Sequence, residues 1–408
     1  MRIIFFAGKG GVGKTSIAAA TGMKTAEAGK RTIVLSLDIA HSLSDVFDLH
    51  SGEINVKPDS NQLLAGILDQ NKGRPVEVMK NLYIQELDIQ EEIRNNWAEI
   101  HGYLSRLFAV TGMDDILADE FAVLPGMEEV SLLLYVNKYI RESAYEVIIL
   151  DCAPTGESIR FMSIPSTLDW YMRKLFRLER NVAKLVRPLA KRMTDIPLPG
   201  DEYFEAVSRL FDQLNGVDKI LTDPTVTTVR LVTNPEKIVL KETQRAYMYF
   251  SLYRAAIDAV IVNRIYPDTV EDPFFASRMS SQKAYLNNAL EMFTPVPVIF
   301  APLMPEEVLG RDRLDKLGDI IYDKRDPAGI YHDEPPFIIE KNQTGHDLRI
   351  ALPFASKEEI EIKMASGELF IRLGGFKKQM ILPGSLADAE NVTARMAEKH
   401  LIISFSRR

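Results

Sequence analysis

The stretch "FFAGKGGVGKTS", residues 5–16, decides the fold because it joins a strand to a helix through a glycine-rich loop. Residues 8–15 match the pattern G-x-x-x-x-G-K-[ST], which binds nucleotide phosphates when it follows a strand and opens a helix. The run "RIIFFA" (2–7) supplies that strand. A glycine-rich turn with incidental lysines is the alternative, and the full match in this context disfavours it.

The loop predicts how ATP and Mg²⁺ would be held. Glycines permit positive φ angles, so that backbone N–H groups face the phosphates, and the helix N-terminus favours an anion. Lys14 would contact the β- and γ-phosphates, and the Thr15 hydroxyl would bind Mg²⁺. The nucleotide-binding residues predicted in the loop are Gly10, Gly11, Val12, Gly13, Lys14, Thr15 and Ser16. Lys9 is a second lysine with no evident task on the same nucleotide.

Composition narrows the class of protein. The chain has 408 residues, is 46% hydrophobic and 26% charged, and carries a net charge of −8. These values are typical of a globular protein with one large α/β domain and a smaller one, and the negative charge disfavours nucleic acid as a partner. We find no secretory signal and no apolar run of ~18 residues, so we expect a cytoplasmic protein without direct membrane insertion.

Short, nearly continuous apolar runs alternate with helical stretches along residues 1–325. This pattern predicts an α/β fold with a doubly wound, mostly parallel sheet of the P-loop NTPase type, covered by helices on both faces. Two helical insertions are expected at about 88–142 and 165–215, a linker at 326–336, and a small all-β sandwich at 337–408. The predicted strands of the sheet are 2–7, 31–38, 145–151, 229–234, 259–265 and 296–301.

The segment 168–192 reads as one amphipathic helix, with Pro188 ending or kinking it near its close. Apolar residues such as Leu178 and Val182 fall on one side, and lysines and arginines on the other. The apolar side could line a groove for a client helix, or it could pack on the ATPase core and leave the basic side in solvent. The sequence leaves both readings open.

Two acids follow predicted strands at the edge where such folds bind ligands. Asp38 ends the second strand, and Asp151 follows four apolar residues. Either one could cap a helix. Together with the phosphate loop, they are better read as residues that position water and metal.

The motifs "KGGVGKT", "DIAHSLSD" and "DCAPTGESIRFMSIP" resemble those of the ArsA family of anion-transporting ATPases, which includes the ATPases that target tail-anchored proteins. The resemblance covers about residues 1–325. The strands that follow are similar to the α-crystallin-like domain of some ArsA homologues.

This resemblance implies a nucleotide-dependent homodimer in which Lys9 reaches the partner's phosphates. Asp38 then matches the acid that positions the attacking water, and Asp151 is a metal-site residue of the second switch, with Thr155 and Gly156. The predicted catalytic residues are Lys9, Lys14 and Asp38, and the predicted metal residues are Thr15 and Asp151. The resemblance assigns the adenine side of the site to Asn263, for which a turn residue is the alternative, and to Pro302.

The chain also departs from the family pattern. Cys152 is its one cysteine, so neither a chain nor a dimer can supply the three thiolates of an arsenite site.

Three functions remain to be weighed. An ATPase that switches a dimer for client or anion handling is favoured, and a slow ATPase that binds hydrophobic helices of membrane proteins is the alternative. A MinD- or ParA-like positioning ATPase is disfavoured, because the chain ends in the strand-like "HLIISFSRR" and is acidic.

Overall fold

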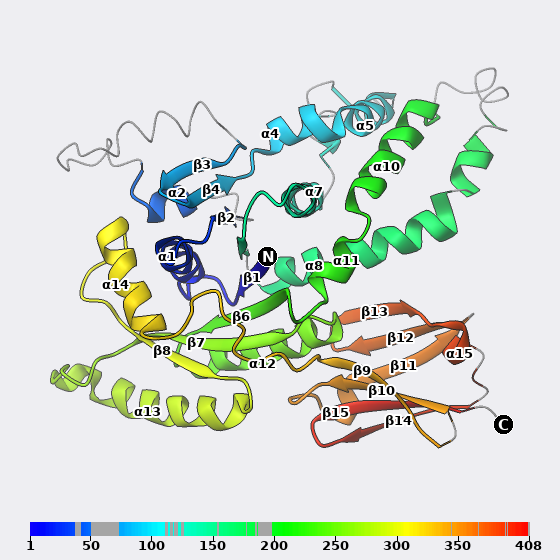
Figure 1. Cartoon of the computed structure of the whole chain (residues 1–408). Coiled ribbons are helices and arrows are strands. Elements are labelled where there is room, and N and C mark those ends of the chain that lie inside the picture. Colours follow the sequence, from blue (N-terminus) through cyan, green and yellow to red (C-terminus); the bar gives the residue numbers. More distant parts are fainter. Residues whose placement is uncertain are drawn as a thin grey trace.

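The structure is a computed structural model of the chain (Figure 1). It describes residues 1–36, 42–49, 73–110, 113–114, 117, 121–123, 126–152, 155–176, 178–183, 186, 198–343, 345–365, 367–387, 389 and 391–406. The predicted catalytic residue Asp38 lies outside this set, as do Pro188 and much of the segment 184–197.

An eight-stranded sheet, in the order β3-β4-β2-β5-β1-β6-β7-β8, forms the centre of the large domain. All neighbouring strands pair in parallel except β3 and β4, which confirms the predicted α/β class. The sequence reading missed the edge hairpin of β3 and β4, whose short strands are joined at Asn81, a residue with φ of 67°. The strands are β1 Arg2–Ala7, β2 Thr32–Ser36, β3 Val76–Met79, β4 Leu82–Glu86, β5 Val147–Asp151, β6 Thr227–Thr233, β7 Ile257–Ile265 and β8 Val298–Pro302.

Helices cover both faces of this sheet because successive side chains of each buried strand point to opposite sides. In β1, Ile3 and Phe5 enter the core beneath α7, α8 and α12, whereas Ile4 and Phe6 enter the core beneath α1 and α14. The helices of these layers are α1 Lys14–Glu27, α2 Ser42–Val46, α7 Met127–Glu142, α8 Thr155–Tyr171, α11 Val217–Leu221, α12 Lys237–Leu252, α13 Pro273–Phe293 and α14 Arg311–Tyr322.

The ranges of both predicted insertions contain helices, and α5 and α10 lie side by side through a small apolar cluster around Trp97 and Leu210 (Figure 1). The boundary predicted at residue 168 is wrong. Helix α8 begins at Thr155, runs through Pro165 and continues into a π-helical turn. The remaining elements are α4 Ile89–Glu92, the π-helix Ile93–Trp97, α5 Ala98–Val110, the π-helix Met172–Phe176 and α10 Asp201–Leu214. Within the described residues, no helix combines the length and apolarity that a membrane crossing requires.

The C-terminal part folds as two antiparallel sheets packed on a shared apolar core. One sheet has the order β14-β15-β10-β9 and the other β11-β12-β13. Met248 and Leu252 of α12 belong to the same apolar cluster, so the sandwich packs directly on the ATPase domain (Figure 1). The strands are β9 Phe337–Lys341, β10 Gly345–Ala351, β11 Ile360–Ala365, β12 Glu368–Leu373, β13 Phe376–Ile381, β14 Asn391–Ala397 and β15 His400–Ser406, and the short helix α15 spans Gly384–Ala387.

The start of the segment 326–336, expected as a linker, is tied to the large domain. The fully buried Arg230 donates hydrogen bonds to the backbone oxygens of Pro327 and Gly329, each at 2.8 Å. Arg230 also lies 3.4 Å from the carboxylate of Asp258, which accepts a second contact from Arg2 at 3.0 Å. One buried carboxylate therefore compensates two buried guanidinium groups.

We expect Asp258→Ala to lower the free energy of unfolding by about 3–5 kcal/mol, because it leaves two buried arginines without their carboxylate. Chemical denaturation monitored by circular dichroism measures the change. The matched control is Asp315→Ala, which removes one of several carboxylates around Lys24 at the surface and should cost less than about 1 kcal/mol. Equal losses in the two variants would contradict the role of Asp258.

Candidate active site

The phosphate loop lies between the end of β1 at Ala7 and the start of α1 at Lys14. Lys14 is 9% exposed, and its Nζ atom donates to the backbone oxygen of Lys9 at 3.2 Å, so its side chain folds back over the loop. A cation held over backbone N–H groups at a helix N-terminus is the arrangement that binds a phosphate chain.

Two positions of the loop have room only for glycine. Gly13 has φ of 92°, and a Cβ atom there would lie 2.5 Å from Nδ2 of Asn263. A Cβ atom at Gly8 would lie 2.2 Å from the backbone oxygen of Val232. The loop therefore approaches the ends of β6 and β7 closely, and a larger residue at either position would displace it.

The end of β7 holds the loop by hydrogen bonds. Asn263 is 7% exposed and donates through Nδ2 to the backbone oxygen of Val12 at 2.9 Å. Arg264 donates through Nη1 to the backbone oxygen of Gly11 at 2.8 Å. The structure thus places Asn263, the predicted adenine-side residue, directly against the phosphate loop.

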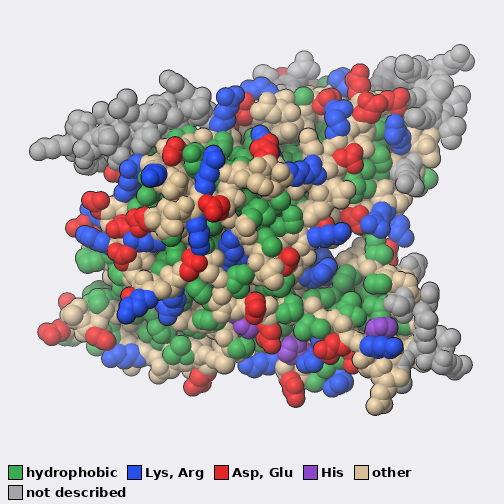
Figure 2. Space-filling model, viewed as in Figure 1, with side chains coloured by type: hydrophobic (Ala, Val, Ile, Leu, Met, Phe, Trp, Pro, Cys, Tyr) green, Lys and Arg blue, Asp and Glu red, His purple; other side chains and the backbone are tan. Residues whose placement is uncertain are grey.

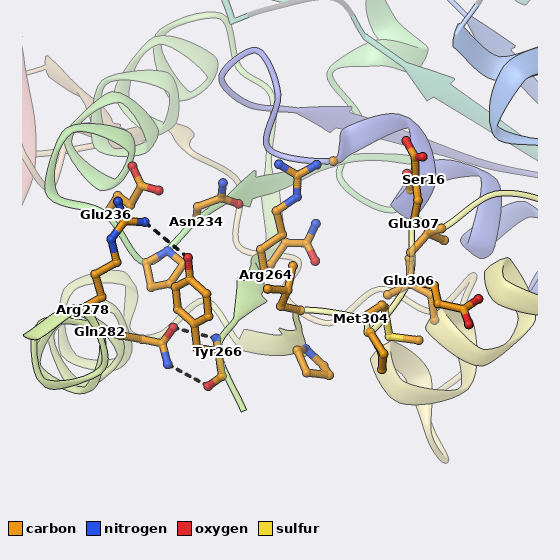
Figure 3. A pocket seen from close by; sticks show the side chains of 18 of the residues that line it. Ser16, Asn234, Glu236, Arg264, Tyr266, Arg278, Gln282, Met304, Glu306 and Glu307 are labelled. Atoms are coloured by element: carbon orange, nitrogen blue, oxygen red, sulfur yellow. Dashed lines mark hydrogen bonds between the residues drawn. The ribbon is translucent and has the colours of Figure 1, made fainter. Parts of the chain in front are cut away.

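A cavity of about 920 Å³ opens beside the loop (Figure 3). Gly13 and Ser16 of the loop line it together with Asn263 and Pro302, so the structure brings together both predicted halves of a nucleotide site. Pockets for small ligands commonly have volumes of roughly 300–1,000 Å³. Its size and its continuity with the loop suit a nucleotide.

The sequence reading missed several residues of this cavity, and Tyr266 is the most firmly positioned of them. Gln282 of α13 accepts from the backbone N–H of Tyr266 at 2.8 Å and donates to its backbone oxygen at 3.1 Å (Figure 3). Arg278 donates to the tyrosine hydroxyl at 3.4 Å. No motif marks this cluster, because Gln282 meets Tyr266 only when α13 folds back along β7. Other missed lining residues are Asn234, Glu236, Arg264 and Met304.

The predicted metal residue Asp151 ends β5, where its backbone is in register with Phe6 of β1 and Ser36 of β2. Asp151 is 1% exposed, and the hydroxyl of the nearby Thr155 is buried without a hydrogen-bond partner among the described residues. Carboxylate and hydroxyl oxygens are ligands and water acceptors that Mg²⁺ prefers. Asp151 and Thr155 therefore fit a magnesium site, and Thr15 at the start of α1 stays a predicted residue of it.

Cys152 follows Asp151 and is buried. Burial raises the pKa of its thiol well above the ordinary value, the charge of Asp151 adds to this effect, and Lys14 opposes it. The thiol therefore stays protonated and is a poor ligand for a soft metal or metalloid.

Lys9 contacts its own chain in this structure. Its Nζ atom lies 3.7 Å from a carboxylate oxygen of Glu242 on α12, and the two side chains are 39% and 28% exposed. A pair this long and this exposed contributes little to stability. Lys9 can therefore leave Glu242 at small cost.

A mostly parallel sheet, a phosphate loop after its first strand and an adjoining cavity define a P-loop nucleotide-binding protein. Comparison with known proteins identifies the family. Residues 1–323 match the model of the anion-transporting ATPase, and residues 343–405 match that of the HSP20-like domain found in ArsA. The chain therefore belongs to the ArsA family.

Curated relatives agree with this assignment. A protein of Aquifex aeolicus (strain VF5), whose name proposes an arsenical pump-driving ATPase, is 46% identical over 410 residues, covering 100% of both chains. A protein of Chlorobaculum tepidum with the same kind of name is 35% identical, covering 99% of this chain and 96% of its own. The ATPase get3 of Aspergillus terreus is 28% identical, covering 79% of this chain and 90% of its own.

Proposed function

We propose that this protein is a Mg²⁺-dependent ATPase that works as a nucleotide-driven homodimer, in which ATP hydrolysis drives conformational switching for handling a client or an anion. The observation that carries the proposal is the continuity of the phosphate loop with a cavity of about 920 Å³ that Asn263 and Pro302 also line. Membership of the ArsA family supports the same activity.

The roles of Lys14, Thr15 and Asp151 follow from where they lie, and those of Lys9 and Asp38 follow from the resemblance to the ArsA family. Lys14 at the N-terminus of α1 neutralises charge on the β- and γ-phosphates, and Thr15 and Asp151 hold Mg²⁺ and its water shell. Mg²⁺, when bound, offsets the negative charge that develops on the transferred phosphoryl group. Lys9 from the partner subunit completes the site, and Asp38 positions the attacking water.

The dimer requirement is tested by measuring ATP turnover per subunit as the protein concentration is varied. We expect turnover per subunit to rise with concentration and then level off, and to vanish when EDTA removes Mg²⁺. Analytical ultracentrifugation with ADP and a fluoroaluminate mimic of the phosphoryl group should show a dimer. Turnover per subunit that stays constant from dilute to concentrated protein, with a monomer throughout, would contradict the proposal.

Surface-exposed apolar residues favour a hydrophobic client over arsenite. Phe121 of the first insertion is 58% exposed, and Leu178, Val182 and Val186 of the second are 60%, 49% and 40% exposed. The last three recur every four residues, which places them on one helical face. These three residues are exposed and are not packed on the ATPase core. The interpretation in which the apolar side of segment 168–192 packs on the core therefore does not hold for them.

We expect the triple variant Leu178→Ser, Val182→Ser, Val186→Ser to fold normally but to lose most of its capture of an apolar helical peptide, because it removes an exposed apolar face. Pull-down of the peptide by the nucleotide-bound protein measures the loss. Phe274→Ser on α13 is the matched control, because Phe274 is 76% exposed and lies outside the insertions. Unchanged capture by the triple variant would contradict the proposal that this apolar face binds a client.

A further inference from the structure

A second cavity, of about 810 Å³, lies where the C-terminal sandwich meets the ATPase domain. Its walls come from the C-terminal part of α8, from the end of α10, from α11, from the residues that follow α12 and from β13. It is separate from the nucleotide cavity and shares none of its lining residues. Figure 2 shows Lys and Arg side chains beside this junction.

Positive charge dominates the lining. Five residues with cationic side chains and two with carboxylates line the cavity, and one of the five, Arg173, is paired with Asp169 at 2.9 Å. The remaining carboxylate, Asp218, is exposed on α11. The other cationic residues that line the cavity are Lys219, Arg254, Lys377 and Lys378.

Lys378 is a buried cationic residue of this lining. It is 7% exposed, its Nζ atom donates to the hydroxyl of Ser166 on α8 at 3.2 Å, and it lies 4.6 Å from the centroid of the Tyr253 ring. Within the described part of the chain, Lys378 forms no ion pair. Burial, the largest effect, and the charge of Arg254 lower the pKa of Lys378 to about 8, and the charge of Asp218 opposes them only in part.

Such a lysine is costly to keep charged without a partner, because desolvation disfavours the ammonium form. A bound anion would remove that cost. The cavity also has apolar walls, with Trp170, Phe211 and Met380, so it suits an anion that carries an apolar or aromatic body.

We propose that this cavity is a binding site for a small organic phosphate, whose phosphate group contacts Lys378 and Arg254 and whose body lies against the apolar wall. The site is positioned to affect the ATPase. Helix α8 begins at Thr155, beside the predicted magnesium residues, and carries Ser166 at the new site. Helix α12 carries Glu242, the partner of Lys9, and leads to Arg254.

Competitive acetylation of lysines, read by mass spectrometry, tests the proposal in the full-length protein at pH 7, with saturating ADP and Mg²⁺ filling the nucleotide site. The added compounds are inorganic phosphate and phenyl phosphate, which separate a bare anion from one with an aromatic body. A bound dianion that raises the pKa of Lys378 by about one unit should slow its acetylation about tenfold. Lys363, exposed on β11, is the internal control and should react at an unchanged rate.

Direct binding gives a second readout. Isothermal titration with phenyl phosphate, again with ADP and Mg²⁺ present, should detect one site in the wild type and in Lys363→Met, and about tenfold or greater weakening in Arg254→Gln. Protection of Lys378 by phenyl phosphate but not by phosphate would identify the aromatic body as part of recognition. Equal acetylation of Lys378 with and without both compounds, or unchanged affinity in Arg254→Gln, would overturn the proposal.

Discussion

Lys14→Ala should abolish ATP turnover and weaken ATP binding. Lys14 is 9% exposed and lies against the loop backbone at the N-terminus of α1, where the phosphates are expected to bind. Removing one preorganised electrostatic group from an active site costs about 10²–10³ in rate, and here the binding of the substrate phosphates is lost as well. Release of phosphate under steady-state conditions and equilibrium dialysis of labelled ATP measure the two effects.

Lys30→Ala is the control for Lys14, because Lys30 lies just after α1 and, within the described residues, its side chain pairs only with the exposed Asp326. It should turn over ATP like the wild type. Should Lys14→Ala do the same, the loop would not be the site of hydrolysis.

Lys9→Ala should spare ATP binding and slow hydrolysis about 10³-fold, at the lower end of the range for a cation supplied in trans to a phosphoryl group. The expectation rests on the proposed dimer. The Lys9 side chain does not reach toward its own Lys14 but lies 3.7 Å from Glu242, and this exposed pair is weak enough to exchange for a partner's phosphates. Single-turnover hydrolysis at saturating ATP isolates the chemical step.

Two controls separate a trans role from a local one. Glu242→Gln removes the contact that Lys9 makes in its own chain and should leave the chemical step intact, whereas a local role would give the same loss as Lys9→Ala. Mixing Lys9→Ala with Lys14→Ala should restore part of the activity, because in a mixed dimer the intact loop lysine of one subunit meets the intact Lys9 of the other. No recovery on mixing, in dimers shown to exchange subunits, would refute the trans role.

Much of the sheet could be predicted because its strands are buried on both faces. Such strands are nearly continuous apolar runs, as in the predicted runs that became β1, β5 and β7, and helices separate them. The hairpin of β3 and β4 was missed since these strands have only four and five residues, too few to stand out as apolar runs. The prediction placed a helix at 168–192, whereas α8 begins at Thr155 and runs through Pro165, a residue that usually ends or kinks a helix.

Some residues of the candidate site could likewise be predicted from the sequence, and others could not. Residues within one contiguous motif, such as Lys14 and Thr15, were predictable because the chemistry of the loop depends on fixed spacing along the chain. Tyr266 and Gln282 were not, since their contact joins a strand end to the middle of a following helix.

The sequence by itself determined the phosphate loop, the parallel sheet that carries it, the family and the inability of one cysteine to build a thiolate site. All of these depend on residues close together along the chain or on counts. The tertiary structure alone decided that Lys9 contacts Glu242, that Arg2 and Arg230 share Asp258, and that Lys378 is buried at the junction with the sandwich. These facts depend on distances and burial between segments that are far apart in sequence, and only packing sets them.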